Sequence, residues 1–238
     1  MAASRAKGLV LSLFPGADLF GMAFEREGWC VVRGPDALLG GDVRSFHAIA
    51  GRFDGVIGGP PCKAFSIASR GTTPTQGNLI PEFERVVSEA APRWWVMENV
   101  PRAPVPAGAR WSEVVDALAF GAEQHRRRRF SSNLILPLEG VAVIHPDPWP
   151  TVTATEHKYA GGSRDRRRAG RKVGRRMTLA EVNRAMGLPE DWQTPALGVA
   201  AAYQVRGNGV PLQMGAAIVR AVERSLARES AHARSSVA

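Results

Sequence analysis

The sequence has only two cysteines among 238 residues, Cys30 and Cys62, and they lack the paired spacing of a zinc site. A disulfide scaffold is therefore excluded, and we expect a cytoplasmic protein without bound metal. Acidic residues are also few, since 22 Asp and Glu stand against 31 Lys and Arg, which gives a net charge of +9. So basic a chain usually binds a polyanion, and nucleic acid is favoured over a membrane because no lipid anchor is visible.

Long hydrophobic runs are missing as well. The first apolar run, residues 8–14, ends at Pro15-Gly16 and is too short for a signal core or a membrane span. It is expected to open a globular fold instead. With 45% hydrophobic residues and six Trp, the chain can bury a core of its own, and its length suits one domain or one domain with a small appendage.

Short apolar runs alternate with helical patterns along the first hundred residues. The expected strands are 9–14, 30–32, 53–57 and 94–97, and the expected helices are 19–27 and 81–91. This alternation predicts a parallel, helix-covered α/β sheet whose ligands lie outside the carboxyl ends of the strands. In the second half, the expected helices are 111–119, 178–186 and 211–228, and the expected strand is 130–136.

Two groups of residues beyond the predicted strands suit a nucleotide-like ligand. The turn from Phe14 to Asp18 contains Gly16 and leads into a helix N-terminus, which attracts anionic or polar groups. Asp36 and Asp42 lie where a carboxylate can hold a ribose hydroxyl or an adenine amine. On the residues alone, a purely structural turn is equally consistent, and an aspartate that accepts from its own loop backbone is the simpler interpretation.

Stronger candidates follow the next two strands. Cys62 comes directly after a Gly-Gly-Pro-Pro run, which fixes it near solvent, and Lys63 favours its thiolate. A free cysteine more often fills an apolar space, but the flanking glycines and prolines favour a nucleophile. Glu98 ends an apolar strand, where burial can raise the pKa of its carboxyl for proton transfer. The alternative for Glu98 is a capping or surface role.

Two basic segments stand out in the second half. In the first, at 124–129, alternate residues of an extended chain share a face, so Arg126 and Arg128 are predicted to point together into a pocket. A solvated charge run is the usual alternative, and phosphate contact is a close rival. The second segment, 158–176, carries nine Lys and Arg, one Asp and four glycines, which predicts a cationic loop rather than a helix.

Taken in order, these motifs resemble those of the DNA cytosine-5 methyltransferases. The matching segments are LFPG at 13–16, GDV at 41–43, PPC at 60–62 with FS at 65–66, ENV at 98–100, QHRRR at 124–128, RMTL at 176–179, GLP at 187–189 with Trp192, and GNGVP at 207–211. The resemblance runs from about residue 9 to residue 222, and the Pro-Cys, Glu-Asn-Val and Gln-x-Arg-x-Arg motifs in this order are highly specific. It implies a Rossmann-like S-adenosylmethionine-dependent methyltransferase fold.

The resemblance also implies an activity, which is methyl transfer to carbon 5 of a flipped cytosine in DNA through a covalent cysteine adduct. Cys62 would attack carbon 6, Glu98 would protonate ring nitrogen 3, and Arg128, with Arg126 beside it, would hold carbonyl oxygen 2. The residues implied to bind S-adenosylmethionine are Phe14, Gly16, Asp36 (the expected ribose ligand), Asp42, Val43, Pro61 and Asn208. The expected nucleic-acid contacts are Lys63, Ser66, Arg166, Arg167, Arg168, Arg171 and Lys172.

The chain departs from the family pattern at the first turn and after the cysteine. Ser12 stands where the family usually has Asp, and residues 17–19 stand where it has several glycines, so cofactor contacts in this turn are expected to be rearranged. Lys63 stands where Gln is usual, which is expected to alter a base or backbone contact.

The family's target recognition domain is expected to be much reduced here, to residues 137–176. This region lies between two catalytic segments, 1–136 and 177–226, and residues 227–238 are expected to form a disordered tail. Two alternatives remain open: the same chemistry on RNA, and a catalytically silent nucleic-acid-binding protein of the same fold. The expected setting is a prokaryotic or phage DNA modification enzyme, as in restriction–modification systems.

Overall fold

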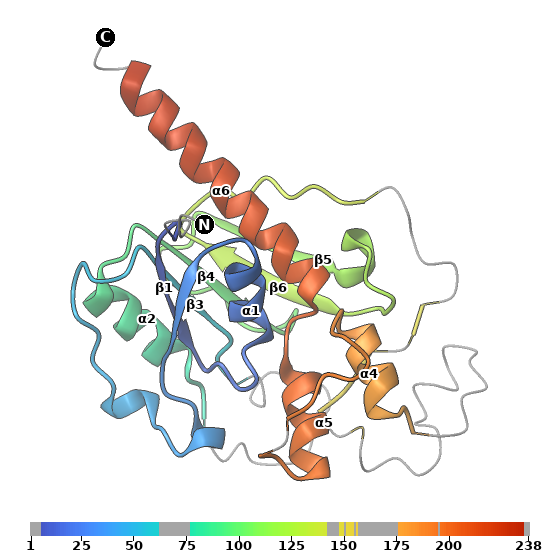
Figure 1. Ribbon diagram of the computed structural model, residues 1–238. Coiled ribbons are helices and arrows are strands. Elements are labelled where there is room, and N and C mark those ends of the chain that lie inside the picture. The colour runs from blue at the N-terminus through green and yellow to red at the C-terminus, as the bar shows by residue number, and fades with distance from the viewer. Residues whose placement is uncertain are drawn as a thin grey trace, which may run out of the picture.

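A six-stranded sheet in the order β2-β1-β3-β4-β6-β5 forms the centre of the molecule (Figure 1). It is seen in a computed structural model that describes residues 6–61, 77–141, 148–149, 151–154, 156, 176–194 and 196–235. The strands are β1 Leu9–Leu13, β2 Cys30–Arg33, β3 Gly55–Gly58, β4 Trp94–Asn99, β5 Trp111–Asp116 and β6 Arg127–Ser132. Strands β1 to β4 are parallel, whereas β6 pairs antiparallel with both β4 and β5. The predicted α/β class is confirmed, and only the β5–β6 edge departs from the parallel pattern.

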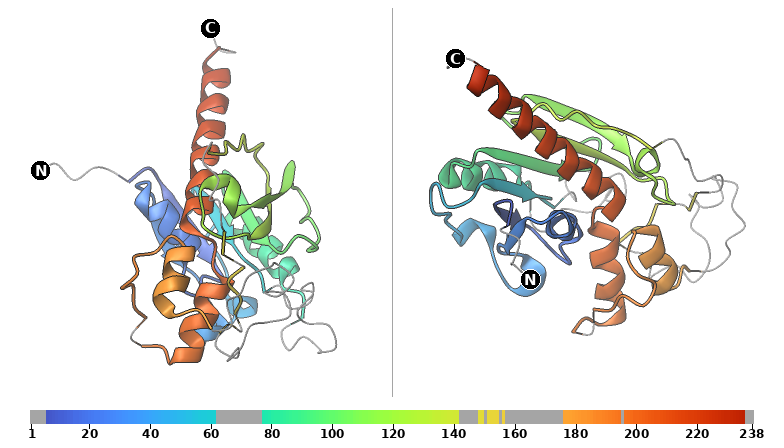
Figure 2. Two further views of the ribbon diagram at one scale, coloured as in Figure 1. Left: turned by 90° about the vertical axis from the view of Figure 1, so that its right-hand side faces the viewer. Right: turned by 45° about the horizontal axis from the view of Figure 1, so that its top comes forward.

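Helices cover both faces of this sheet (Figure 2). They are α1 Leu19–Arg26, α2 Ile80–Ala90, α4 Leu179–Ala185, α5 Val199–Asn208 and α6 Leu212–Ser235, with 3-10 helices η1 Ala37–Leu39, η2 Val43–Ser45 and η5 Ala117–Phe120. Because successive side chains of a strand point to opposite faces, β1 contributes to two cores. Val10 packs into the core formed with α1 and α6, and Leu11 packs into the core formed with α2.

The predicted helix at 111–119 is wrong. Residues Trp111–Asp116 form strand β5, which pairs with β6 in a continuous register from Trp111 opposite Ser132 to Asp116 opposite Arg127. Val114 and Val115 favour an extended backbone, and the neighbouring strand supplies hydrogen-bond partners that a local pattern does not reveal. The predicted strand at 130–136 is likewise displaced, since β6 begins at Arg127 and ends at Ser132.

The C-terminal half differs from expectation at two further places. Helix α5 was not predicted, and α6 continues to Ser235, so the expected disordered tail is wrong for residues 227–235. Once α6 is nucleated against the core, Ala, Arg and Glu residues extend it at little cost. An ion pair of 3.4 Å between Arg93 and Glu229 also ties its outer part to the body of the domain. No helix in the described part of the chain is long and apolar enough to cross a membrane.

Candidate active site

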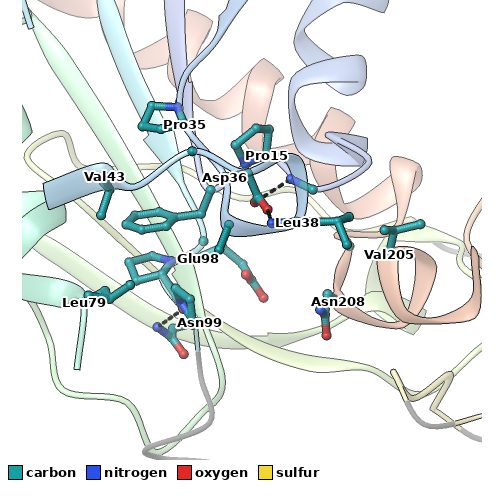
Figure 3. A pocket seen from close by; sticks show the side chains of 18 of the residues that line it. Pro15, Pro35, Asp36, Leu38, Val43, Leu79, Glu98, Asn99, Val205 and Asn208 are labelled. Atoms are coloured by element: carbon teal, nitrogen blue, oxygen red, sulfur yellow. Dashed lines mark hydrogen bonds between the residues drawn. The ribbon is translucent and has the colours of Figure 1, made fainter. Parts of the chain in front are cut away.

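A cavity of about 670 Å³ lies at the carboxyl edge of the parallel strands. The loops after β1, β2, β3 and β4 form most of its wall, and α5 contributes Val205 and Asn208 (Figure 3). The volume is in the usual range for cofactor and ligand pockets. All seven residues predicted to bind the cofactor line this cavity: Phe14, Gly16, Asp36, Asp42, Val43, Pro61 and Asn208. Glu98 and Arg128 line it too.

The turn after β1 has a strained backbone that other loops hold in place. Phe14 has φ +56°, a left-handed conformation that is unfavourable for a bulky residue. Asp36 stabilises the turn, because its Oδ2 accepts from the Gly16 amide at 2.9 Å and its Oδ1 accepts from the Leu38 amide at 2.7 Å. A Cβ built on Gly16 would meet nothing within 4 Å, so this turn opens into free space. Asp36 therefore both shapes the cavity and lines it.

The structure explains the unusual residues of the first turn. The hydroxyl of Ser12 donates to Asp18 Oδ1 at 2.7 Å, and the same oxygen accepts from the Gly21 amide and caps α1. Arg33 Nε lies 3.0 Å from Asp18 Oδ2. A carboxylate is thus present at this end of β1, supplied from position 18 rather than from position 12. Burial raises the pKa of the Asp18 carboxyl from 3.8 to about 6, against the opposing effects of Ser12 and Arg33.

This raised pKa predicts an unusual pH dependence of stability. Because the folded pKa lies above the unfolded one, the contribution of Asp18 is complete below about pH 4 and is lost as the pH rises through about 6. We expect the difference in free energy of unfolding between wild type and Asp18→Asn to shrink by up to about 3 kcal/mol from pH 4 to pH 7. Urea titrations at several pH values measure it, with the exposed Asp191→Asn as control. A difference independent of pH would contradict the assignment.

Asp42 has the simpler role considered from the sequence, that of an aspartate that accepts from its own loop backbone. Its side chain caps η2 by accepting from the Arg44 amide at 3.0 Å, and the Arg44 guanidinium lies 3.4 Å from the same oxygen. Val43 behind it is buried in the α2-side core. Arg44 also lines the cavity, which sequence reasoning missed. The proposed contact of Asp42 with an adenine ring stays a prediction.

Glu98 and Arg128 are brought together by strand register. Glu98 of β4 lies opposite Phe130 of β6, and Arg128 is two residues from Phe130, so all three side chains share a face of the sheet. Arg128 Nε lies 2.8 Å from Glu98 Oε1. Burial raises the pKa of Glu98, while the positive charges of Arg128 and Arg126 oppose this shift. A buried acid that retains its proton at higher pH than usual therefore lies in the cavity wall beside a cation.

Asn99 connects this acid to the loop that leads to the predicted nucleophile. Its Nδ2 donates to the Pro60 carbonyl at 3.1 Å, and its Oδ1 accepts from the Val100 amide. The described part of this loop ends at Pro61, which lines the cavity wall. The predicted site residues Cys62, Lys63, Ser66, Arg166, Arg167, Arg168, Arg171 and Lys172 lie outside the described residues. Sequence reasoning recognised the Glu-Asn-Val motif but assigned no role to Asn99.

Arg126 does not join Arg128 in the cavity. Its side chain is fully buried, and its guanidinium donates to the carbonyls of Val152, Gly207 and Gly209 at 2.6–2.8 Å. The expectation that both arginines point into one pocket is therefore wrong. The two side chains share a face of the segment, but Val152 and the end of α5 cover Arg126, whereas Arg128 faces the cavity. Asn208, flanked by two of these carbonyls, does line the cavity. Helix α5 was the main omission of sequence reasoning, although an Ala-rich run ending in Gly-Asn-Gly could have indicated it.

Comparisons with known proteins find similarity in sequence over parts of this chain. The profile of the "C-5 cytosine-specific DNA methylase" family matches residues 38–105 and 141–224, more than half of the chain. Type II methyltransferase M.AquIA of Picosynechococcus is 55% identical over 49 residues, which cover 20% of each chain. Type II methyltransferase M.FnuDI of Fusobacterium nucleatum is 30% identical over 109 residues, 38% of this chain and 32% of that protein. The matched regions thus span a third or less of these relatives.

Similarity of fold extends further along the chain. The crystal structure of a Spodoptera frugiperda DNMT2 mutant superposes with a TM-score of 0.62 and 13% identity, covering 89% of this chain and 98% of that one. Entamoeba histolytica methyltransferase EhMeth superposes with a TM-score of 0.60 and 12% identity, covering 93% and 99%. At these identities the likeness shows a common methyltransferase fold, the Rossmann-like architecture that the motifs predict.

Proposed function

The chain belongs to the C-5 cytosine-specific DNA methylase family, and on that premise we propose that it transfers a methyl group from S-adenosylmethionine to carbon 5 of cytosine in DNA. The observation that carries the proposal is the buried Glu98 carboxyl, which lies 2.8 Å from Arg128 in a cavity whose wall includes Pro61, the residue before Cys62. Nucleophilic attack on an electron-poor ring position requires a nucleophile, an acid and a cation, and this site offers a candidate for each.

The cavity fits the cofactor that this reaction needs. Open space above Gly16 admits a ligand close to the backbone, and Phe14, Leu38 and Val43 offer apolar surface for a heterocyclic ring. In this proposal Asp36 holds the ribose, Asp42 lies beside the adenine, and Asn208 closes the opposite wall. S-adenosylmethionine, when bound, supplies an electrophilic methyl group.

The residues of this chain act on the base. The target cytosine leaves the duplex and enters the cavity, where Arg128 donates to carbonyl oxygen 2. The Cys62 thiolate forms a bond to carbon 6 while Glu98 gives its proton to nitrogen 3, so the electron pair displaced from the ring makes carbon 5 nucleophilic. Carbon 5 gains the methyl group, with S-adenosylhomocysteine as the leaving group, and then loses its proton to a base. Breakage of the sulfur–carbon bond re-forms the double bond between carbons 5 and 6, and nitrogen 3 returns its proton to Glu98. 5-Methylcytosine and the free thiolate are released.

One assay tests this function against its alternatives. Purified protein is given S-adenosylmethionine with a labelled methyl group and either duplex DNA or structured RNA, and the nucleosides are analysed. We expect label in 5-methylcytosine from DNA. Label only in RNA would assign the same chemistry to the other nucleic acid. No transfer to either, together with no binding of the cofactor in a titration, would identify a catalytically silent binding protein.

A further prediction concerns the basic segment at 158–176. Its arginines can bind many phosphates, whereas fixed base contacts, each worth about 1–3 kcal/mol, require ordered groups in a groove. We therefore expect a short or degenerate recognition site. Neutralising Arg166, Arg167 and Arg168 together should weaken binding to all sequences alike and flatten the salt slope by about 0.9 for each phosphate that these arginines neutralise in the wild type.

Methylation maps and salt titrations of the wild type and this triple variant measure both effects. The charge-matched control neutralises Arg220, Arg228 and Arg234, three exposed residues of α6 on the helix that runs away from α5 (Figure 1). A well-defined wild-type site of four or more base pairs would refute the degenerate-site prediction. A triple variant that modifies different cytosines would mean that these arginines read bases.

A further inference from the structure

Arg126 is a buried cation whose guanidinium binds backbone carbonyls. Its Nη1 donates to the Val152 carbonyl at 2.7 Å, and its Nη2 donates to the carbonyls of Gly207 and Gly209 at 2.6 and 2.8 Å. The planar guanidinium presents several donors in a fixed fork, so one side chain can hold three acceptors that come from two separate segments. A lysine, with its donors on one nitrogen, cannot reproduce this geometry.

Two of these carbonyls flank Asn208 at the end of α5. The last carbonyls of a helix have no partner within it, and a cation at this end satisfies them and complements the helix dipole. Close packing holds the same segment from other sides. A Cβ on Gly207 would lie 2.3 Å from the Ala154 amide nitrogen, and one on Gly209 would lie 2.6 Å from Leu19 Cδ1. The backbone around Asn208 is therefore clamped between Arg126, the 153–154 segment and α1.

Asn208 itself is presented to the cavity. Its side chain is exposed, and none of the hydrogen bonds found among the described residues involves its amide group. Figure 3 shows Asn208 across the cavity from Pro35 and Val43. Its backbone is thus fixed by buried contacts while its amide group faces the space proposed for the cofactor.

Gln124, on the same face of the segment, extends this attachment. Its Nε2 donates to the Ala185 carbonyl at 2.6 Å, and its Oε1 accepts from the Val152 amide at 3.0 Å. Different partners thus bind the three alternate residues of this face, which are Gln124, Arg126 and Arg128. The first two bind the backbone of the C-terminal half, and only Arg128 reaches the acid in the cavity.

From this geometry we infer that Arg126 is a positioning residue of the cofactor site, which sets cofactor affinity by holding Asn208 in the cavity wall. The inference rests on the proposed function, since it takes the cavity to bind S-adenosylmethionine. It departs from the catalytic role expected for Arg126 from sequence, because the side chain is fully buried and does not line the cavity. Loss of Arg126 should therefore raise the Kd for S-adenosylhomocysteine, the product formed from the cofactor. Loss of Arg128 should instead lower the turnover rate.

A double-mutant cycle tests the inference. Calorimetry measures the Kd for S-adenosylhomocysteine in wild type, Arg126→Lys, Asn208→Ala and the double variant. We expect each single substitution to raise this Kd about tenfold and the double variant to resemble Asn208→Ala, because Arg126 acts through Asn208. Additive effects, or an unchanged Kd in Arg126→Lys, would overturn the inference. So would failure of both Arg126→Lys and Arg126→Gln to fold, since Arg126 would then support the whole domain.

Arg128→Ala is the matched control, an arginine two residues away on the same face. It should bind S-adenosylhomocysteine as wild type does and lose methyl transfer. If Arg128→Ala raises the Kd as much as Arg126→Lys does, the division between the two arginines is wrong. If the wild-type protein itself does not bind S-adenosylhomocysteine, the proposed function fails instead, so the two failures are distinguishable.

Discussion

Replacing Cys62 by serine will abolish methyl transfer, by at least about a thousandfold, while folding and cofactor binding stay near normal. An alcohol is far less ionised than a thiol at neutral pH, and the proposed attack on carbon 6 needs an anionic sulfur. Initial rates with labelled S-adenosylmethionine measure the loss, and calorimetry with S-adenosylhomocysteine checks the binding site.

The chain provides its own control for this substitution. Cys30 is the only other cysteine. It is exposed at the start of β2, whereas the cavity lies beyond the carboxyl ends of the strands. Cys30→Ser should transfer methyl groups as fast as wild type. Full activity of Cys62→Ser would refute the covalent mechanism.

A trapping experiment examines the same bond directly. DNA that contains 5-fluorocytosine has no removable proton at carbon 5, so the sulfur–carbon bond cannot be broken after methyl addition. Wild type and Cys30→Ser should form a complex that survives denaturing electrophoresis, and Cys62→Ser should form none. A trapped complex with Cys62→Ser would show that another residue is the nucleophile.

Glu98→Gln should lower turnover about 10²- to 10⁴-fold, because an amide cannot transfer the proton that nitrogen 3 receives. Burial raises the pKa of Glu98, so its acid form persists to a higher pH than that of an exposed glutamate. If Glu98 is the acid, wild-type kcat/KM should decline as the pH rises through this raised pKa, and the decline should be absent from Glu98→Gln. Rate measurements over a pH series decide both points.

Matched variants make the Glu98 result specific. Glu113 lies on β5, opposite Phe130 and exposed, so Glu113→Gln should leave the rate and its pH profile unchanged. Arg128→Ala should be impaired comparably to Glu98→Gln, and Arg127→Ala, whose side chain is exposed, should be tolerated. Equal damage from Arg127→Ala would mean that the register of β6 is wrong by one residue.

The sequence by itself determined the fold class and the wall of the cavity. Strands β1 to β4 are short apolar runs punctuated by Gly, Pro and Asp, and such local patterns do not depend on distant partners. The predicted cofactor residues either follow these strands directly or end α5, and the carboxyl ends of parallel strands meet at one edge. Their order along the chain was therefore enough to place Phe14, Asp36, Pro61 and Glu98 around the same space.

Only the tertiary structure decided what covers each face. An alternating pattern states that Arg126 and Arg128 share a side, but the 152 segment and α5, which bury Arg126, come from elsewhere in the chain. For the same reason, Trp111–Asp116 became a strand once β6 lay beside it. The raised pKa of Asp18 likewise depends on burial by distant residues, which outweighs the opposing charge of Arg33. Burial and strand pairing depend on residues that are distant in sequence, so a local sequence pattern cannot predict them.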